Sequence, residues 1–247
     1  MCELFAMSAG HHYTAQEYLP PFAEGARENI NGWGIGFFRS GQVHIEKSCE
    51  GIFAGDQMHD SFRRLARVID SRIILSHIRC PESGHMKESH AQPLTDHFLD
   101  HNWLFIFSGE APKMLGYQSP RRLMSEPLLA SRVLEFVRDE MESGLARQPR
   151  QSLFQVMAQG CKKLITNYPG KYTFFLANET VLFAFLNHSQ ILTYQDPKAL
   201  GETLIVTTVT GGLTSNPEHW QTFPNHDPAR GQILIISGAD LLYLGHL

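Results

Sequence analysis

The order in which apolar patterns change along the chain constrains the fold more than any other feature of this sequence. Apolar runs with the length and spacing of strands recur up to residue 107 and return from residue 172. Between them, residues 126–142 and 153–165 carry apolar side chains at helical spacing. Strands, then two helices, then strands again predict one layered α+β domain over residues 1–247 rather than two independent units.

A glycine-rich strand is the sharpest local signal. Residues 31–38 place glycines between large apolar side chains, which lets another backbone or a ligand approach one face of the strand. Gly41 then predicts a turn into a returning strand at 42–47. The remaining predictions are strands at 2–9, 72–79, 103–107, 172–177, 181–186, 204–209, 233–236 and 241–244, a helix at 60–69 capped by Asp60 or Ser61, a polar loop through Pro20 and Pro21, and a turn at Asp96–Asn102.

The charge balance argues against nucleic-acid binding. With 21 basic and 25 acidic side chains, the chain lacks the broad basic field that nucleic acids and anionic membranes attract. Its apolar runs are far shorter than the roughly 20 residues of a membrane span, and its start has no signal-peptide pattern. The four cysteines lie far apart without C-x-x-C spacing, as is typical of reduced thiols. We therefore expect a cytoplasmic protein whose partners are small molecules or proteins.

Cys2 directly follows the initiator methionine, and so small a second residue permits removal of Met1. The freed α-amino group, with a reference pKa of about 7.7–8.0, can then act as the base for a thiol whose reference pKa is about 8.5. Nucleophile and base would share one residue. The alternative is that Cys2 is a small apolar residue of an edge strand, and its position alone favours that alternative.

Six short motifs follow one another in a fixed order. They are Met1-Cys2-Glu3-Leu4, Gly32-Trp33-Gly34-Ile35, His77-Ile78-Arg79, Gln92-Pro93-Leu94, Ser108-Gly109, and Leu213-Thr214 followed by Glu218-His219-Trp220. In this order they resemble the class II glutamine amidotransferases, which are N-terminal-nucleophile (Ntn) hydrolases, and in particular the stand-alone bacterial type. The resemblance spans nearly the whole chain. It implies a four-layer αββα sandwich of two antiparallel sheets, and an amidohydrolase that needs no cofactor.

The resemblance also implies roles for individual residues. Cys2 would attack the side-chain amide of glutamine, ammonia would leave, and water would release glutamate from a γ-glutamyl thioester. Arg79 would hold the substrate α-carboxylate in a bidentate fork, and the backbone N–H of Gly109 would face the developing oxyanion. Trp33 and Gly34 would line the floor beneath Cys2.

His77 lies two residues before Arg79, so both side chains point to the same face of an extended strand. We group His77 with the substrate-binding residues, as a hydrogen-bonded structural histidine rather than a catalyst, because an Ntn site needs no imidazole base.

Two positions depart from the family pattern. Ser108 stands where the family has an oxyanion-binding asparagine, and a hydroxyl is shorter than an amide. Residues 123–127 lack the aspartate that binds the substrate α-ammonium, and Glu126 is the predicted substitute. Two hypotheses therefore stay open. One is an enzyme that acts on glutamine or a related γ-glutamyl amide and passes ammonia to a separate acceptor protein. The other is a catalytically silent homologue that binds a ligand or regulates another protein.

A histidine-rich span suggests a third, weaker hypothesis of a metal-binding module. Cys80, His85, His90, His97 and His101 lie close together in sequence. Their spacing matches no zinc signature, so we favour structural or surface roles and expect no metal site.

Overall fold

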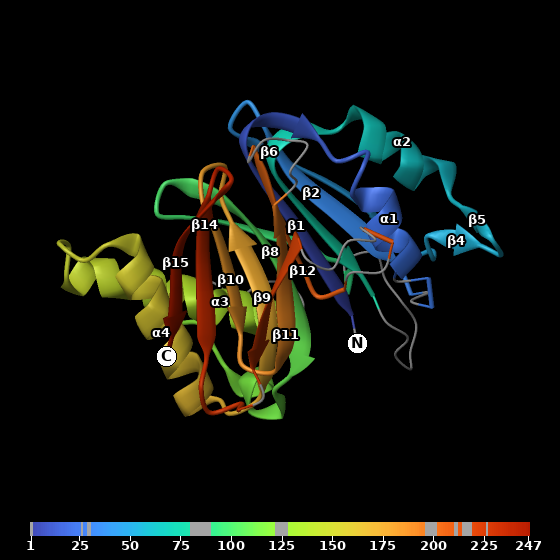
Figure 1. Ribbon diagram of the computed structural model, residues 1–247. Coiled ribbons are helices and arrows are strands. Elements are labelled where there is room, and N and C mark those ends of the chain that lie inside the picture. The colour runs from blue at the N-terminus through green and yellow to red at the C-terminus, as the bar shows by residue number, and fades with distance from the viewer. Residues whose placement is uncertain are drawn as a thin grey trace.

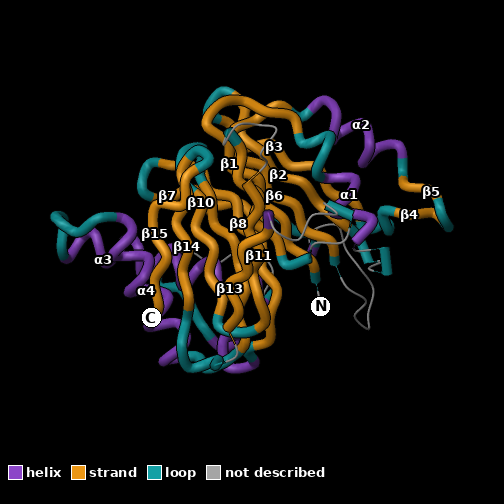
Figure 2. The backbone as a smooth tube through the Cα atoms, in the orientation of Figure 1, coloured by secondary structure: helices purple, strands orange, loops and turns teal. Residues whose placement is uncertain are grey.

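Two antiparallel sheets pack face to face, with helices on the outer side of each (Figure 1). The computed structural model describes residues 2–25, 27–28, 31–79, 90–121, 128–195, 202–209, 212–213, 219–225 and 227–247. Figure 2 shows the strands in the middle of the molecule and helices at both flanks. None of the helices in these ranges is long and apolar enough to cross a bilayer.

The larger sheet is built from both ends of the chain. Its strands are β1 (Glu3–Thr14), β2 (Trp33–Arg39), β3 (Gln42–Ser48), β6 (Asp70–Ile78), β11 (Ser189–Gln195), β12 (Thr203–Thr207) and β13 (Trp220–Asn225). They are arranged in the order β13-β11-β12-β1-β6-β2-β3, so β1 lies at the centre. β1 pairs with β6 on one side and with β12 on the other, and both pairings are antiparallel.

The smaller sheet faces the larger one. Its strands are β7 (Leu94–Phe98), β8 (His101–Glu110), β9 (Lys171–Ala177), β10 (Leu182–Leu186), β14 (Gln232–Ser237) and β15 (Asp240–His246), in the order β15-β14-β10-β9-β8-β7. The other elements are a short hairpin of β4 (Phe53–Ala54) and β5 (Gln57–Met58), the helices α1 (Leu19–Gly25), α2 (Asp60–Val68), α3 (Leu129–Arg147) and α4 (Leu153–Asn167), and a 3-10 helix at Pro112–Gly116.

Three apolar clusters hold the layers together. Leu4 and Ala6 of β1 belong to the cluster between the two sheets, whereas Phe5 and Met7 belong to the cluster beneath α1 and α2. This division follows from the alternation of side chains along a strand. A third cluster lies between the smaller sheet and the helices α3 and α4. The expected four-layer αββα sandwich is therefore confirmed, and because its strands are buried on both faces, they appear in the sequence as nearly continuous apolar runs.

A buried arginine anchors α3. Arg138 donates hydrogen bonds to Asp96 of β7 (2.7 Å), to Asp139 (3.0 Å) and to the hydroxyl of Ser119 (2.7 Å). Its side chain is 4% exposed, and the two carboxylates are almost as deeply buried. Paired buried charges of this kind set the position of a helix because the unpaired alternatives are costly.

The structure corrects several local predictions. The loop predicted through Pro20 and Pro21 is wrong, because both prolines lie in the first turn of α1, where a missing N–H costs nothing. The turn predicted at Asp96–Asn102 is a hairpin that joins β7 to β8. The predicted capping of α2 is also wrong, because its N-cap is His59 and no side chain caps it. The strands β11 and β13 were not predicted.

Candidate active site

A pocket of about 140 Å³ opens at the end of the sandwich where β1 begins and where β6 and β8 end. Its lining residues are Cys2, His77, Arg79, His90, Gln92, Phe107, Ser108, Gly109, Leu128, Leu129 and Ala130. The pocket therefore brings together Cys2, His77, Arg79, Ser108 and Gly109 from three separate segments of the chain. It also includes Leu128, Leu129 and Ala130 at the start of α3, close in sequence to the predicted substrate-binding residue Glu126.

Strand register explains why Cys2 lies near Arg79. In the antiparallel pair of β1 and β6, Glu3 is opposite Ile78. The residue before Glu3 and the residue after Ile78 therefore emerge side by side. The Arg79 backbone N–H also donates to the carbonyl oxygen of Gly32 (3.0 Å), which ties this end of β6 to the start of β2.

Hydrogen bonds to Thr208 fix the start of β1. The backbone N–H of Leu4 donates to the Thr208 hydroxyl oxygen (2.9 Å), and the Thr208 N–H donates to the Leu4 carbonyl (3.0 Å). The Thr208 hydroxyl donates to a carboxylate oxygen of Glu3 (2.6 Å). Burial raises the pKa of Glu3, and the bond from Thr208 opposes this effect. Cys2 is thus held from its C-terminal side by an ordered strand.

The three described cysteines have different surroundings. Cys2 is half-buried in the pocket, Cys49 is exposed, and Cys161 is fully buried between α4 and its neighbours. Burial raises the pKa of the Cys161 thiol far above its ordinary value, which makes this thiol unreactive. Among these three, Cys2 combines access with polar neighbours.

His77 is buried at the back of the pocket, with 1% of its surface exposed. Burial, and then the positive charges of Arg79 and Lys47, lower its pKa to about 3, so the ring is neutral near pH 7. Neither ring nitrogen has a hydrogen-bond partner in the described part of the chain. The Phe107 backbone opposes the lowering of the pKa, but its geometry does not amount to a hydrogen bond. We expected His77 to be hydrogen-bonded, but its ring forms no hydrogen bond with any described residue.

Ser108 and Gly109 lie near the end of β8, at the pocket wall. Ser108 is 3% exposed and lines the pocket. Gly109 has no room for a side chain, because a Cβ there would lie 2.0 Å from the carbonyl oxygen of Lys171 and 2.9 Å from the Phe107 ring. Only glycine lets β8 pass this close to β9.

Gln92 was quoted as part of a motif but was given no role from the sequence. Its side-chain amide donates to the Phe107 carbonyl oxygen (3.1 Å), and its side-chain oxygen accepts from the Phe107 N–H (2.6 Å). This pair of bonds joins the segment before β7 to the strand that carries Ser108 and Gly109. No spacing rule in the sequence signals such a clamp.

Trp33 and Gly34 do not line the pocket. Trp33 faces the cluster beneath α1 and α2 and packs edge-on against Phe62, with 5.1 Å between ring centroids. Gly34 faces the opposite way and lies against the backbone of Gln92. Glu126 is outside the described residues.

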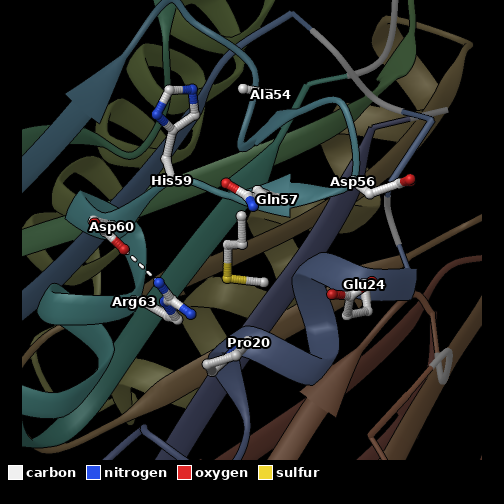
Figure 3. A pocket seen from close by; sticks show the side chains of 9 residues that line it. Pro20, Glu24, Ala54, Asp56, Gln57, His59, Asp60 and Arg63 are labelled. Atoms are coloured by element: carbon white, nitrogen blue, oxygen red, sulfur yellow. Dashed lines mark hydrogen bonds and ion pairs between the residues drawn. The ribbon is translucent and has the colours of Figure 1, made fainter.

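A larger cavity of about 660 Å³ lies between α1, the β4–β5 hairpin and α2 (Figure 3). Its carboxylates are paired with arginines. Asp60 forms an ion pair with Arg63, which Figure 3 shows as a dashed line, and Arg27 pairs with Glu24 (2.7 Å) and Asp56 (3.3 Å). The cavity holds none of the residues predicted to be catalytic.

The described residues of the histidine-rich span do not form a cluster. His97 and His101 lie in the β7–β8 hairpin, His90 lines the pocket, and Cys80 and His85 are outside the described residues. Within the described ranges, no group of three or more His, Cys, Asp or Glu side chains is arranged to hold a metal ion.

Several solved structures share this fold. The allosteric regulatory enzyme of purine biosynthesis superposes with a TM-score of 0.68 at 13% identity and covers 100% of this chain. Glutamine phosphoribosylpyrophosphate amidotransferase from B. subtilis gives 0.63 at 15% identity, also over 100% of this chain. This chain spans about half of both proteins, 48% and 49% of their lengths. A predicted glutamine amidotransferase from Pseudomonas aeruginosa gives 0.60 at 16% identity, with 98% of this chain and 100% of that chain covered.

At these identities the structural comparisons define the fold alone, an α+β sandwich. The sequence defines the family, because residues 1–202 match the family model of the class-II glutamine amidotransferases. The chain belongs to this family. No curated protein matches the sequence significantly.

Proposed function

We propose that this protein hydrolyses glutamine or a related γ-glutamyl amide, with Cys2 as the nucleophile. The observation that carries the proposal is the position of a half-buried thiol beside an arginine, in a pocket at the end of the central strand of the larger sheet. The thiol can reach a ligand there, and a guanidinium is the group best suited to hold a carboxylate in a fixed orientation.

The reaction begins with removal of Met1, which frees the α-amino group of Cys2. This amine takes the thiol proton, and the sulfur attacks the carbonyl carbon of the amide. The C–N bond then breaks, the leaving nitrogen receives a proton from the ammonium group, and ammonia departs. Water attacks the resulting γ-glutamyl thioester and releases glutamate. His77 is a poor base for the first step, because its pKa of about 3 lies far below that of a thiol.

Two further groups serve this reaction. Arg79 binds the substrate carboxylate through two parallel hydrogen bonds. The backbone N–H of Gly109 and the hydroxyl of Ser108 face the oxygen that becomes negatively charged during attack. A Ser108 hydroxyl in this role replaces the amide of an asparagine.

The released ammonia needs an acceptor. We place the acceptor outside residues 1–247. Two structural neighbours are about twice as long as this chain, and only about half of each is covered by it.

Glutamate release tests the proposal. The processed protein is incubated with glutamine, and Cys2→Ala is compared with Cys49→Ala, which removes an exposed thiol outside the pocket. We expect release by the wild type and by Cys49→Ala, and none by Cys2→Ala. Intact mass shows whether Met1 has been removed. Equal release by all three proteins contradicts the proposal. If Met1 is removed but neither release nor labelling of Cys2 by diazo-oxo-norleucine occurs, the protein is instead a silent ligand-binding homologue.

A further inference from the structure

His77 is an exception among the buried polar groups near the pocket. Its neighbour Ser76 donates to the carbonyl oxygen of Gly34 (3.1 Å), and the side-chain amide of Gln92 is occupied at both ends by Phe107. His77 differs from Ser76 and Gln92, because neither of its ring nitrogens has a hydrogen-bond partner among the described residues. Buried polar groups in native proteins are nearly always hydrogen-bonded, so an unpaired one in a pocket wall suggests a ligand.

The charge state of His77 limits what it can offer to a ligand. Because the ring is neutral, it carries one N–H donor and one bare nitrogen that accepts. The Phe107 backbone lies near the ring and favours a proton on the nitrogen that faces it, although its carbonyl already accepts a hydrogen bond from Gln92. The other nitrogen is then the acceptor.

A primary carboxamide has hydrogen-bond donors that match this acceptor nitrogen. The carboxamide oxygen accepts hydrogen bonds, and under the proposed function Ser108 and Gly109 supply them. The NH₂ group brings two donors and needs acceptors. Arg79 can only donate, and the side chain of Gln92 is already used. Compared with Arg79 and Gln92, His77 has an unused acceptor in the pocket wall.

We propose that the bare nitrogen of His77 accepts a hydrogen bond from the NH₂ group of the substrate carboxamide, so that His77 selects amides over esters and carboxylates. The inference rests on the proposed function and adds amide recognition to it. An ester or an ionised carboxylate has no N–H to donate, so either ligand leaves this nitrogen unpaired. Such a mismatch discriminates strongly when the unpaired group is buried.

The test compares glutamine with the γ-methyl ester of glutamate, which differs in the leaving group and lacks the N–H donors. We expect His77→Leu to lower the ratio of the two kcat/KM values, amide over ester, at least tenfold. His77→Gln, which keeps an acceptor oxygen, recovers much of the ratio. The control is His246→Gln, a change at an exposed histidine of β15, which leaves the ratio unaltered.

Two results overturn the role of His77 while the proposed function stands: an equal loss for amide and ester in His77→Leu, or no loss for either. If the wild type hydrolyses neither substrate, the proposed function fails instead. In that case, or if His77→Leu does not fold, a ligand-binding measurement on a variant that keeps His77 still tests the proposed hydrogen bond. In Cys2→Ala labelled with ¹⁵N at histidine, glutamine is expected to move the signal of the unprotonated His77 nitrogen while glutamate is not. The same response to both ligands, or to neither, overturns the inference.

Discussion

Gly34 of β2 touches the backbone of Gln92: a Cβ at residue 34 would lie 2.0 Å from the Gln92 carbonyl oxygen. Gln92 in turn clamps Phe107 at the end of β8. The larger sheet and the strand that carries Ser108 and Gly109 are therefore joined through one close approach that only glycine permits.

The first prediction follows from this contact. Gly34→Ala forces Gln92 away from β2 and is expected to lower the free energy of unfolding by about 1–3 kcal/mol, the usual cost of overpacking. Urea denaturation measures the change. Gly116→Ala is the matched control, because a Cβ there meets nothing within 4 Å, and it should leave the stability nearly unaltered. Equal stability of the two variants would contradict the close approach.

The second prediction concerns the clamp itself. Gln92→Leu leaves the buried N–H and carbonyl of Phe107 without their partners, and each unpaired group costs about 1–3 kcal/mol. We expect a lower midpoint in thermal unfolding. Under the proposed function we also expect less glutamate release, because Phe107 no longer holds Ser108 and Gly109 in place. Gln190→Leu, at an exposed position on β11, should change neither property. Full activity in a stable Gln92→Leu protein would show that the clamp does not position the pocket.

A third prediction concerns recognition of the carboxylate. Arg79→Lys keeps the charge but loses the bidentate geometry, so KM for glutamine should rise about tenfold, with a smaller change in kcat. Arg72→Lys is the control, since Arg72 lies on the same strand but is exposed. Steady-state kinetics separate the two parameters, and an unchanged KM in Arg79→Lys would remove this role from Arg79.

The fourth prediction is a dependence of stability on pH. The pKa of His77 falls from 6.5 to about 3 on folding, so between these values the unfolded chain binds a proton that the folded protein does not. Acid therefore favours unfolding. The free energy of unfolding should fall by up to about 1.4 kcal/mol for each pH unit lowered through this window.

The comparison between variants isolates this contribution. His77→Gln cannot titrate, so its stability should decline less steeply than that of the wild type between pH 6.5 and 4. His246→Gln should keep the slope of the wild type. Parallel slopes for the wild type and His77→Gln, measured by denaturant titration at each pH, would show that His77 does not stay neutral in the folded protein.

Much of the fold was accessible from local patterns. The strand at 103–107 and the helix at 153–165 stand out because each fills a buried layer with apolar side chains. The strand β13 was missed because Pro224 interrupts its pattern, and proline is tolerated there since β13 is an edge strand of the larger sheet. The helix α1 was missed because prolines suggest a loop, although they fit the first turn of a helix.

The candidate site was partly accessible for a different reason. Cys2 and Arg79 could be paired from the sequence because motif order pointed to a known family, and strand register then accounts for their proximity. The clamp by Gln92 could not be predicted, because it depends on where the second sheet docks. The start of α3 was indicated only through the family resemblance at Glu126, and not by any local pattern. The position of Trp33 also depends on strand register, since a shift of one residue would turn its side chain to the other face.

The central place of β1 has a consequence for the beginning of the chain. Terminal residues usually fray, but here residues 5–8 are flanked by strands on both sides. Their amide protons should therefore be among the slowest in the protein to exchange with deuterium, because opening this segment requires parting the middle of a seven-stranded sheet. Cys2 is thus attached directly to one of the most rigid strands of the larger sheet.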